Sequence, residues 1–166
     1  MNIVLIGYRG TGKSTVGRLL AARLGRNFVS TDAEIVKHAQ RTISEIVTQE
    51  GWEYFRDLES DICRGLVSRN QLVIDTGGGT ILRAQNVEAL KKNSTVFWLT
   101  ASVETIAKRI GGDNQRPSLT GTKSFVDEIQ DVLRERTPKY QAAADHVIAT
   151  DDRSINQLVE TLLTFV

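Results

Sequence analysis

The chain has 166 residues, of which 40% are hydrophobic and 25% charged, and its formal net charge is +1. This length fits one domain with its own core, so residues 1–166 are predicted to form a single domain. The near balance of charge argues against nucleic acid as a partner, because such proteins carry a dense basic excess. No apolar run approaches the roughly 20 residues of a membrane span, so no membrane is expected and the predicted location is the cytoplasm.

Cys63 is the only cysteine. An intramolecular disulfide and a cysteine-based metal site are therefore excluded, and we interpret Cys63 as a core thiol rather than a nucleophile. The small inventory of exposed hydrophobic residues favours a monomer.

Five short runs of β-branched or large apolar residues predict strands, and segments with helical periodicity separate them. The strands are expected at residues 3–6, 28–30, 72–75, 95–99 and 146–149. Continuous apolar runs suit strands that are buried on both faces. Their alternation with helices predicts a parallel sheet covered by helices.

The predicted helices carry apolar stripes and end signals. Thr42 to Glu45 has the spacing of a capping box, Gly25 is a stop signal, and Ser154 is positioned to cap the last helix. The stripes that should face the core are Val16, Leu19, Leu20 and Leu24; Trp52, Phe55, Leu58, Ile62 and Leu66; and Ile155, Leu158, Val159, Leu162 and Leu163.

Residues 111–124 show neither the apolar runs of the predicted strands nor the helical spacing of the predicted helices. The segment has few apolar residues, several glycines and a proline. It is predicted to be a long mobile loop, and loops of this length in compact domains often serve as lids.

The segment from Gly7 to Ser14, GYRGTGKS, matches the phosphate-binding pattern G-x-x-x-x-G-K-[ST] in full. It follows a predicted strand and opens a predicted helix, a context that disfavours the alternative of a glycine-rich turn with a solvated lysine. Glycines let the backbone turn N–H groups toward one point, and the helix N-terminus adds partial positive charge there. The residues predicted to bind ATP are Gly10, Thr11, Gly12, Lys13, Ser14 and Thr15. Lys13 should reach the β and γ phosphates and Ser14 should bind Mg²⁺.

Further features follow the phosphate-binding motif in a fixed order. They are Asp32 after the second strand, Arg56 and Glu59 in a helix, Gly77-Gly78-Gly79 after the third strand, Arg116-Pro117 in the loop, and Arg136-Thr137-Pro138-Lys139-Tyr140 beyond it. Their order and spacing resemble the shikimate kinase family over essentially the whole chain. The resemblance implies a three-layer α/β/α P-loop kinase with sheet order 2-3-1-4-5. It also implies transfer of the γ-phosphoryl group of ATP to the 3-hydroxyl of shikimate, a step toward chorismate and the aromatic amino acids.

The resemblance assigns a role to each acidic and basic side chain of this set. Asp32 is expected to contact the substrate hydroxyls and accept a proton from the attacking one, and a helix N-cap is a compatible alternative. Arg56 and Arg136 are expected to bind the substrate carboxylate, with Glu59 holding Arg56. For Arg56 alone, a surface ion pair with Glu53 or Glu59 is the simpler interpretation. Arg136 lies on the apolar face of its helix, so its charge should point inward.

The remaining assignments concern the backbone and the nucleotide. Gly77, Gly78 and Gly79 should let the backbone approach the substrate and present N–H donors, the alternative being a plain tight turn. Arg116 resembles the lid arginine that meets charge on the transferring phosphoryl group, although a solvated loop charge is the other interpretation. Arg109 and Arg153 match positions that flank the adenine ring.

The sequence departs from the family pattern in one place. Shikimate kinases commonly read Asp-Thr-Asp at the end of the second strand, where the first Asp assists Mg²⁺ through water, and this chain has Ser30 at that position. Asp75 ends the third strand, where the family usually has a small polar residue. The carboxyl ends of adjacent parallel strands lie close together, so we hypothesise that Asp75 supplies the outer-shell carboxylate that Ser30 lacks.

Two other classes of function remain open from the residues alone. A kinase for another small metabolite, such as gluconate, would keep Lys13, Ser14 and the lid but leave the two arginines less well explained. A nucleotide-dependent switch would need no separate substrate residues, and the chain has no Asn-Lys-x-Asp motif for guanine.

Overall fold

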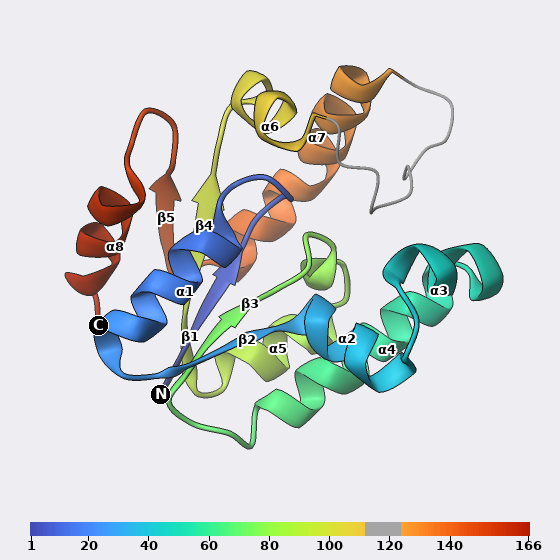
Figure 1. Ribbon diagram of the computed structural model, residues 1–166, viewed down its shortest axis with the longest axis horizontal. Helices are drawn as coiled ribbons and strands as arrows, with labels where there is room; N and C mark the ends of the chain where they lie inside the picture. Colours follow the sequence, from blue (N-terminus) through green and yellow to red (C-terminus); the bar gives the residue numbers. More distant parts are fainter. Residues whose placement is uncertain (112–123) are drawn as a thin grey trace.

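A parallel sheet forms the centre of the computed structural model, which describes residues 1–111 and 124–166 (Figure 1). Its strands are β1 (Asn2–Ile6), β2 (Asn27–Ser30), β3 (Leu72–Asp75), β4 (Ser94–Thr100) and β5 (His146–Ala149). Every neighbouring pair is parallel, and the order is β2-β3-β1-β4-β5. The predicted topology is confirmed, and each predicted strand is correct to within one residue at either end.

Helices cover both faces of this sheet (Figure 1). The helices α1 (Lys13–Leu24) and α8 (Ile155–Leu163) pack on one face, while α4 (Trp52–Leu66), α5 (Ala84–Lys91) and α7 (Phe125–Ala143) pack on the other. The shorter helices are α2 (Thr31–Ala39), α3 (Ile43–Glu50), α6 (Val103–Ile110) and the 3₁₀ turn η1 (Thr80–Leu82). The three-layer architecture is therefore confirmed.

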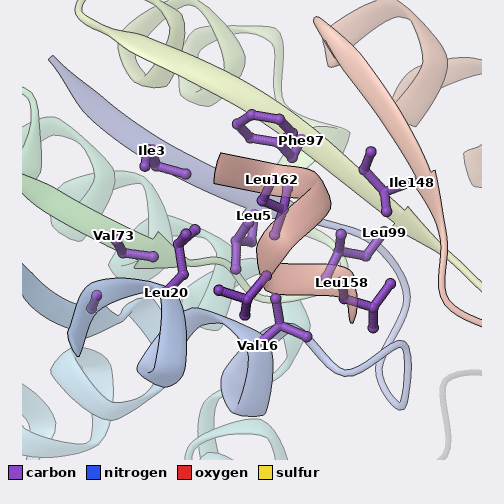
Figure 2. Close-up of a cluster of buried hydrophobic side chains, with 12 residues drawn as sticks. Ile3, Leu5, Val16, Leu20, Val73, Phe97, Leu99, Ile148, Leu158 and Leu162 are labelled. Carbon is purple, nitrogen blue, oxygen red and sulfur yellow. The ribbon is translucent and has the colours of Figure 1, made fainter. Parts of the chain in front are cut away.

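The two cores follow from the alternation of side chains along β1. Ile3 and Leu5 enter the cluster with α1 and α8, which Figure 2 shows, whereas Val4 and Ile6 enter the cluster with α4, α5 and α7. Because both faces are covered, the strand reads as an uninterrupted apolar run. Cys63 lies in the second cluster and is fully buried, and burial raises the pKa of its thiol to about 12. Its interpretation as a core thiol is confirmed.

The helix ends follow the predicted signals. Gly25 ends α1 in a left-handed conformation, and both Thr42 and Ser154 form complete capping boxes. One prediction about α8 is wrong, because Ile155 is 41% exposed rather than turned inward. It is the first residue of that helix, and the stripe that packs on the sheet begins one turn later, at Leu158.

The predicted lid lies largely outside the described residues, as does Arg116. At its boundary Ser124 caps α7 by accepting a hydrogen bond from the backbone N–H of Asp127. Within the two described ranges, none of the helices combines the length and apolar character that crossing a bilayer requires.

Candidate active site

The phosphate-binding loop joins the carboxyl end of β1 to the N-terminus of α1. Gly10 and Gly12 have φ angles of 79° and 92°, in the region that favours glycine. The Lys13 ammonium group donates hydrogen bonds to the carbonyl oxygens of Gly7 at 2.8 Å and Tyr8 at 3.0 Å. Lys13 is only 7% exposed, so the loop holds a positive charge at its own centre, where a phosphate chain would bind.

Asp75 lies directly beside this loop. The Ser14 hydroxyl donates a hydrogen bond of 2.5 Å to Asp75 Oδ2. Burial raises the pKa of Asp75, while the nearby Lys13 ammonium, the Ser14 hydrogen bond and the Arg18 charge act to lower it. A buried carboxylate thus faces the hydroxyl that is predicted to bind the metal ion.

Ser30 occupies the neighbouring position on β2. In the register between β2 and β3, Ser30 is the partner of Asp75. Its hydroxyl caps α2 by accepting a hydrogen bond from the backbone N–H of Ala33. The cap of this helix is therefore Ser30, and the alternative interpretation of Asp32 as the cap is wrong.

Asp32 lies in the first turn of α2 and faces the same cavity as the phosphate-binding loop. This cavity has a volume of about 410 Å³. The residues that line it are Arg9, Gly10, Gly12, Lys13, Ser14, Thr15, Ser30, Asp32, Asp75, Thr76, Gly77 and Gly78. The predicted base, the predicted phosphate ligands and the beginning of the glycine run therefore meet in one place. This place is the carboxyl edge of the sheet, where ligands of open α/β folds bind.

Arg56 and Glu59 form a buried ion pair on α4. Arg56 Nη1 lies 3.0 Å from Glu59 Oε2, and the two side chains are 11% and 0% exposed. The second carboxylate oxygen, Glu59 Oε1, accepts a hydrogen bond of 2.6 Å from the Thr80 hydroxyl of η1. Glu59 thus holds Arg56 and also ties α4 to the turn after the glycine run. A surface ion pair is the wrong interpretation of this arginine.

Each glycine of the run packs against a different predicted substrate residue. A methyl group at Gly77 would lie 2.7 Å from Glu59 Oε1 and 2.9 Å from Asp32 Oδ1. One at Gly78 would lie 3.5 Å from Arg136 Nη1, and one at Gly79 would overlap the Arg56 guanidinium at 2.2 Å. The run is therefore more than a tight turn, because the predicted substrate residues fill the space that side chains would need here.

Arg136 is buried on the inner face of α7, as predicted, and is 8% exposed. No acidic side chain within residues 1–111 and 124–166 forms an ion pair with it. It shares a second cavity, of about 380 Å³, with Arg56. The lining residues are Trp52, Glu53, Arg56, Leu82, Arg83, Val132, Glu135 and Arg136. A buried guanidinium without a carboxylate partner is an unusual and costly feature, and an anionic ligand would relieve it.

The two arginines predicted at the adenine ring lie at the carboxyl end of β5. Arg109 donates hydrogen bonds to the Gly10 carbonyl at 3.1 Å and to the Thr150 hydroxyl at 3.1 Å. Arg153 donates to the Ala149 carbonyl at 3.5 Å and to the Thr161 hydroxyl. Arg153 therefore contacts the last residue of β5 and Arg109 contacts the residue that follows it, and Arg109 also contacts the phosphate-binding loop.

Thr80 and Tyr140 contact the site residues, although the sequence analysis assigned no role to either. Thr80 binds Glu59, and the Tyr140 hydroxyl donates a hydrogen bond of 2.5 Å to the Gly78 carbonyl. A signal for Tyr140 was present, because it lies four residues after Arg136 and therefore on the same helical face.

A phosphate-binding loop beside buried arginines, at the carboxyl edge of a 2-3-1-4-5 sheet, defines a P-loop kinase that acts on a small molecule. Comparison with known proteins gives the family. The family model described as shikimate kinase matches residues 9–166, and the chain belongs to the shikimate kinase family.

Individual relatives agree with this assignment. The shikimate kinase of Nitratidesulfovibrio vulgaris is 47% identical over 90% of this chain and 86% of its own length. That of Persephonella marina is 40% identical over 98% and 96%. The structure of Acinetobacter baumannii shikimate kinase in complex with shikimate matches with a TM-score of 0.94 at 38% identity, covering 99% of this chain and 91% of that one.

Gly79→Ala is expected to raise the KM for shikimate about tenfold, because the new methyl group would displace the Arg56 guanidinium. The affinity for nucleotide should stay within twofold. Steady-state kinetics with each substrate varied in turn would measure both effects.

Gly65→Ala is the matched control for this substitution. A methyl group at this position in α4 meets nothing within 4 Å. We expect unchanged kinetics and a slightly higher melting temperature, since alanine is the better helix former. Equal KM values for shikimate in the two variants would contradict the assigned contact.

Proposed function

We propose that the chain phosphorylates the 3-hydroxyl of shikimate with ATP to give shikimate 3-phosphate, in the biosynthesis of chorismate and the aromatic amino acids, through the residues described above. The observation that carries the site assignment is Arg136, a buried guanidinium that no acidic side chain of the described residues pairs. It lies next to a second arginine and to the glycine run that also lines the phosphate cavity.

Arg136 and Arg56 bind the substrate carboxylate. A guanidinium presents a planar fork of donors that fits two carboxylate oxygens. Glu59 fixes one of the two arginines in place, whereas no acidic side chain in the described part of the chain pairs with Arg136. The substrate ring would then extend along Gly77, Gly78 and Gly79 toward Asp32, which places its hydroxyl groups near the phosphate cavity.

Phosphoryl transfer takes place between Asp32 and Lys13. The Asp32 carboxylate accepts the proton of the 3-hydroxyl while the hydroxyl oxygen forms a bond to the γ-phosphorus atom. The bond from that phosphorus to the β–γ bridging oxygen breaks, and ADP leaves with the electron pair. Lys13 and the loop N–H groups stabilise charge on the β and γ phosphates, and we assign Arg116, outside the described residues, to the same task.

Ser14 and Asp75 fit an Mg²⁺ ion bound with ATP. Mg²⁺ usually keeps several waters and takes one or two protein oxygens besides the phosphates, so it needs no cluster of acidic side chains. Within residues 1–111 and 124–166, no group of three or more His, Cys, Asp or Glu side chains could hold a metal ion. Ser14 would bind the ion directly and Asp75 would accept hydrogen bonds from its waters. When bound, the ion neutralises charge on the phosphates.

The nucleotide base is assigned to the space between Arg109 and Arg153, where a guanidinium could stack on adenine. A monomeric state and a location in the cytoplasm remain predictions.

An ADP-release assay with shikimate, with gluconate and with neither tests the proposed reaction. Turnover with shikimate alone is the expected result. Turnover with gluconate alone would indicate a different metabolite kinase, and absence of turnover with both would indicate a nucleotide-dependent switch.

Arg136→Lys is expected to lower kcat/KM for shikimate by about 10- to 100-fold, because lysine cannot reproduce a two-oxygen contact with a carboxylate. Binding of a fluorescent ADP analogue should not change. Arg134→Lys is the matched control on the same helix, since its side chain is 77% exposed. An equal decrease of kcat/KM in Arg136→Lys and Arg134→Lys would show that Arg136 does not bind the substrate carboxylate.

Asp75→Ser is expected to raise the Mg²⁺ concentration for half-maximal ATP binding about tenfold, with little change in the KM for shikimate. The double variant Ser30→Asp/Asp75→Ser exchanges the two register partners, and it should regain most of the lost Mg²⁺ affinity. Aspartate caps helices as well as serine does, so α2 should be retained. The electron paramagnetic resonance of Mn²⁺ bound with ADP reports the site without turnover. Unchanged metal affinity in Asp75→Ser would exclude the role of Asp75.

A further inference from the structure

The Tyr140 hydroxyl fixes one peptide unit of the glycine run. It donates a hydrogen bond of 2.5 Å to the Gly78 carbonyl oxygen, and Tyr140 is 0% exposed. The ring stacks on Trp98 of β4, with ring centroids 5.6 Å apart and planes inclined by 22°. A rigid aromatic side chain therefore anchors a carbonyl group in a segment that belongs to no helix or strand.

The orientation of this carbonyl determines the orientation of the next N–H group. Across a trans peptide bond the C=O of Gly78 and the N–H of Gly79 point in opposite directions. Since the carbonyl points at the buried Tyr140, the Gly79 N–H points away from that core. Among the described residues, neither Gly78 nor Gly79 uses its N–H in a hydrogen bond. A donor that points away from the core is therefore available between Gly78, which lines the phosphate cavity, and Gly79, which packs against Arg56.

The same hydroxyl also interacts with Arg136. Tyr140 follows Arg136 by four residues on α7, which is about one helical turn. Burial raises the pKa of Tyr140 to about 12, and the charge of Arg136 and its hydrogen bond to the hydroxyl act to lower it. Arg136 in turn lies 3.5 Å from the position of a methyl group on Gly78. The hydroxyl group thus contacts the glycine run and lies close enough to the guanidinium to interact electrostatically with it.

We infer that Tyr140 is a positioning residue for the acceptor substrate, holding the Gly78–Gly79 peptide so that the Gly79 N–H and the Arg136 guanidinium point at the same carboxylate. Tyr140 itself does not touch the substrate. The inference rests on the proposed carboxylate site, which it extends by a backbone donor and by the group that orients it.

Tyr140→Phe is the direct test, because it keeps the ring and its stacking on Trp98 and removes only the hydroxyl. The expected result is an increase of about tenfold in the KM for shikimate, with kcat and nucleotide affinity within twofold of the starting values. In spectra of protein labelled with ¹⁵N-glycine, the Gly79 amide signal should shift on addition of shikimate, and this response should be lost in the variant. A change in stability alone would not produce this combination.

Two control variants separate orientation from general destabilisation. Tyr54→Phe removes a tyrosine hydroxyl from a residue that is 38% exposed, and Leu162→Val weakens the core on the opposite face of the sheet. Both should retain the KM for shikimate, while Leu162→Val lowers the melting temperature. An equal rise in KM for Leu162→Val and Tyr140→Phe would overturn the inference.

Comparison with Arg136→Lys distinguishes this inference from the proposed function. If Arg136→Lys weakens shikimate binding and Tyr140→Phe does not, the carboxylate site stands and the positioning role is wrong. If neither substitution alters the KM for shikimate, the acceptor binds elsewhere and both proposals fail.

Discussion

The site depends on the close approach of a backbone segment to four charged side chains, three of which are buried. Gly77 faces Glu59 and Asp32, Gly78 faces Arg136, and Gly79 faces Arg56. Any Cβ atom at the first or third position would come closer than real Cβ contacts allow. The acid of α2, the ion pair of α4 and the arginine of α7 can all pack against this segment only because Gly77, Gly78 and Gly79 have no side chains.

The distribution of charge around the second cavity explains why one arginine differs from the others. Arg83 forms ion pairs with Asp57 at 2.7 Å and with Glu53 at 3.1 Å, and Arg56 pairs with Glu59. Arg136 lines the same cavity but pairs with none of the acidic side chains in the described residues. A chain with a net charge near zero therefore keeps one local excess of positive charge in a buried position, which favours a single small anion over a polyanion.

Much of the fold and part of the site could be predicted from local patterns. The phosphate-binding loop is contiguous, so its motif and its place between β1 and α1 can be read directly. The inward direction of Arg136 followed from the helical spacing of Ile129 and Val132. The order of the sheet, in contrast, came from the family resemblance, since apolar runs do not specify which strands pair.

The contacts that hold the site in place could not be predicted from local patterns, even where a residue such as Tyr140 lies on a predicted inner face. The bond from Thr80 to Glu59 joins residues 21 positions apart, and the bond from Tyr140 to Gly78 spans 62. Such pairs depend on the packing of η1 and α7 rather than on any motif. Helical spacing is also less reliable at the end of a helix. Ile155 matches the apolar stripe of α8 but lies in its first turn and faces solvent.

The pairing of Ser30 with Asp75 also affects how sequences of such enzymes should be compared. Adjacent strands are separated by only about 4.8 Å, so an acidic group can move from β2 to β3 and remain beside the same serine of the phosphate-binding loop. A position-by-position comparison would record a lost acid at residue 30 and an unrelated gain at residue 75. If Asp75 has the role that we propose, the two differences amount to a single carboxylate displaced sideways by one strand, and they are recognised as related only when positions are matched across the sheet rather than along the chain.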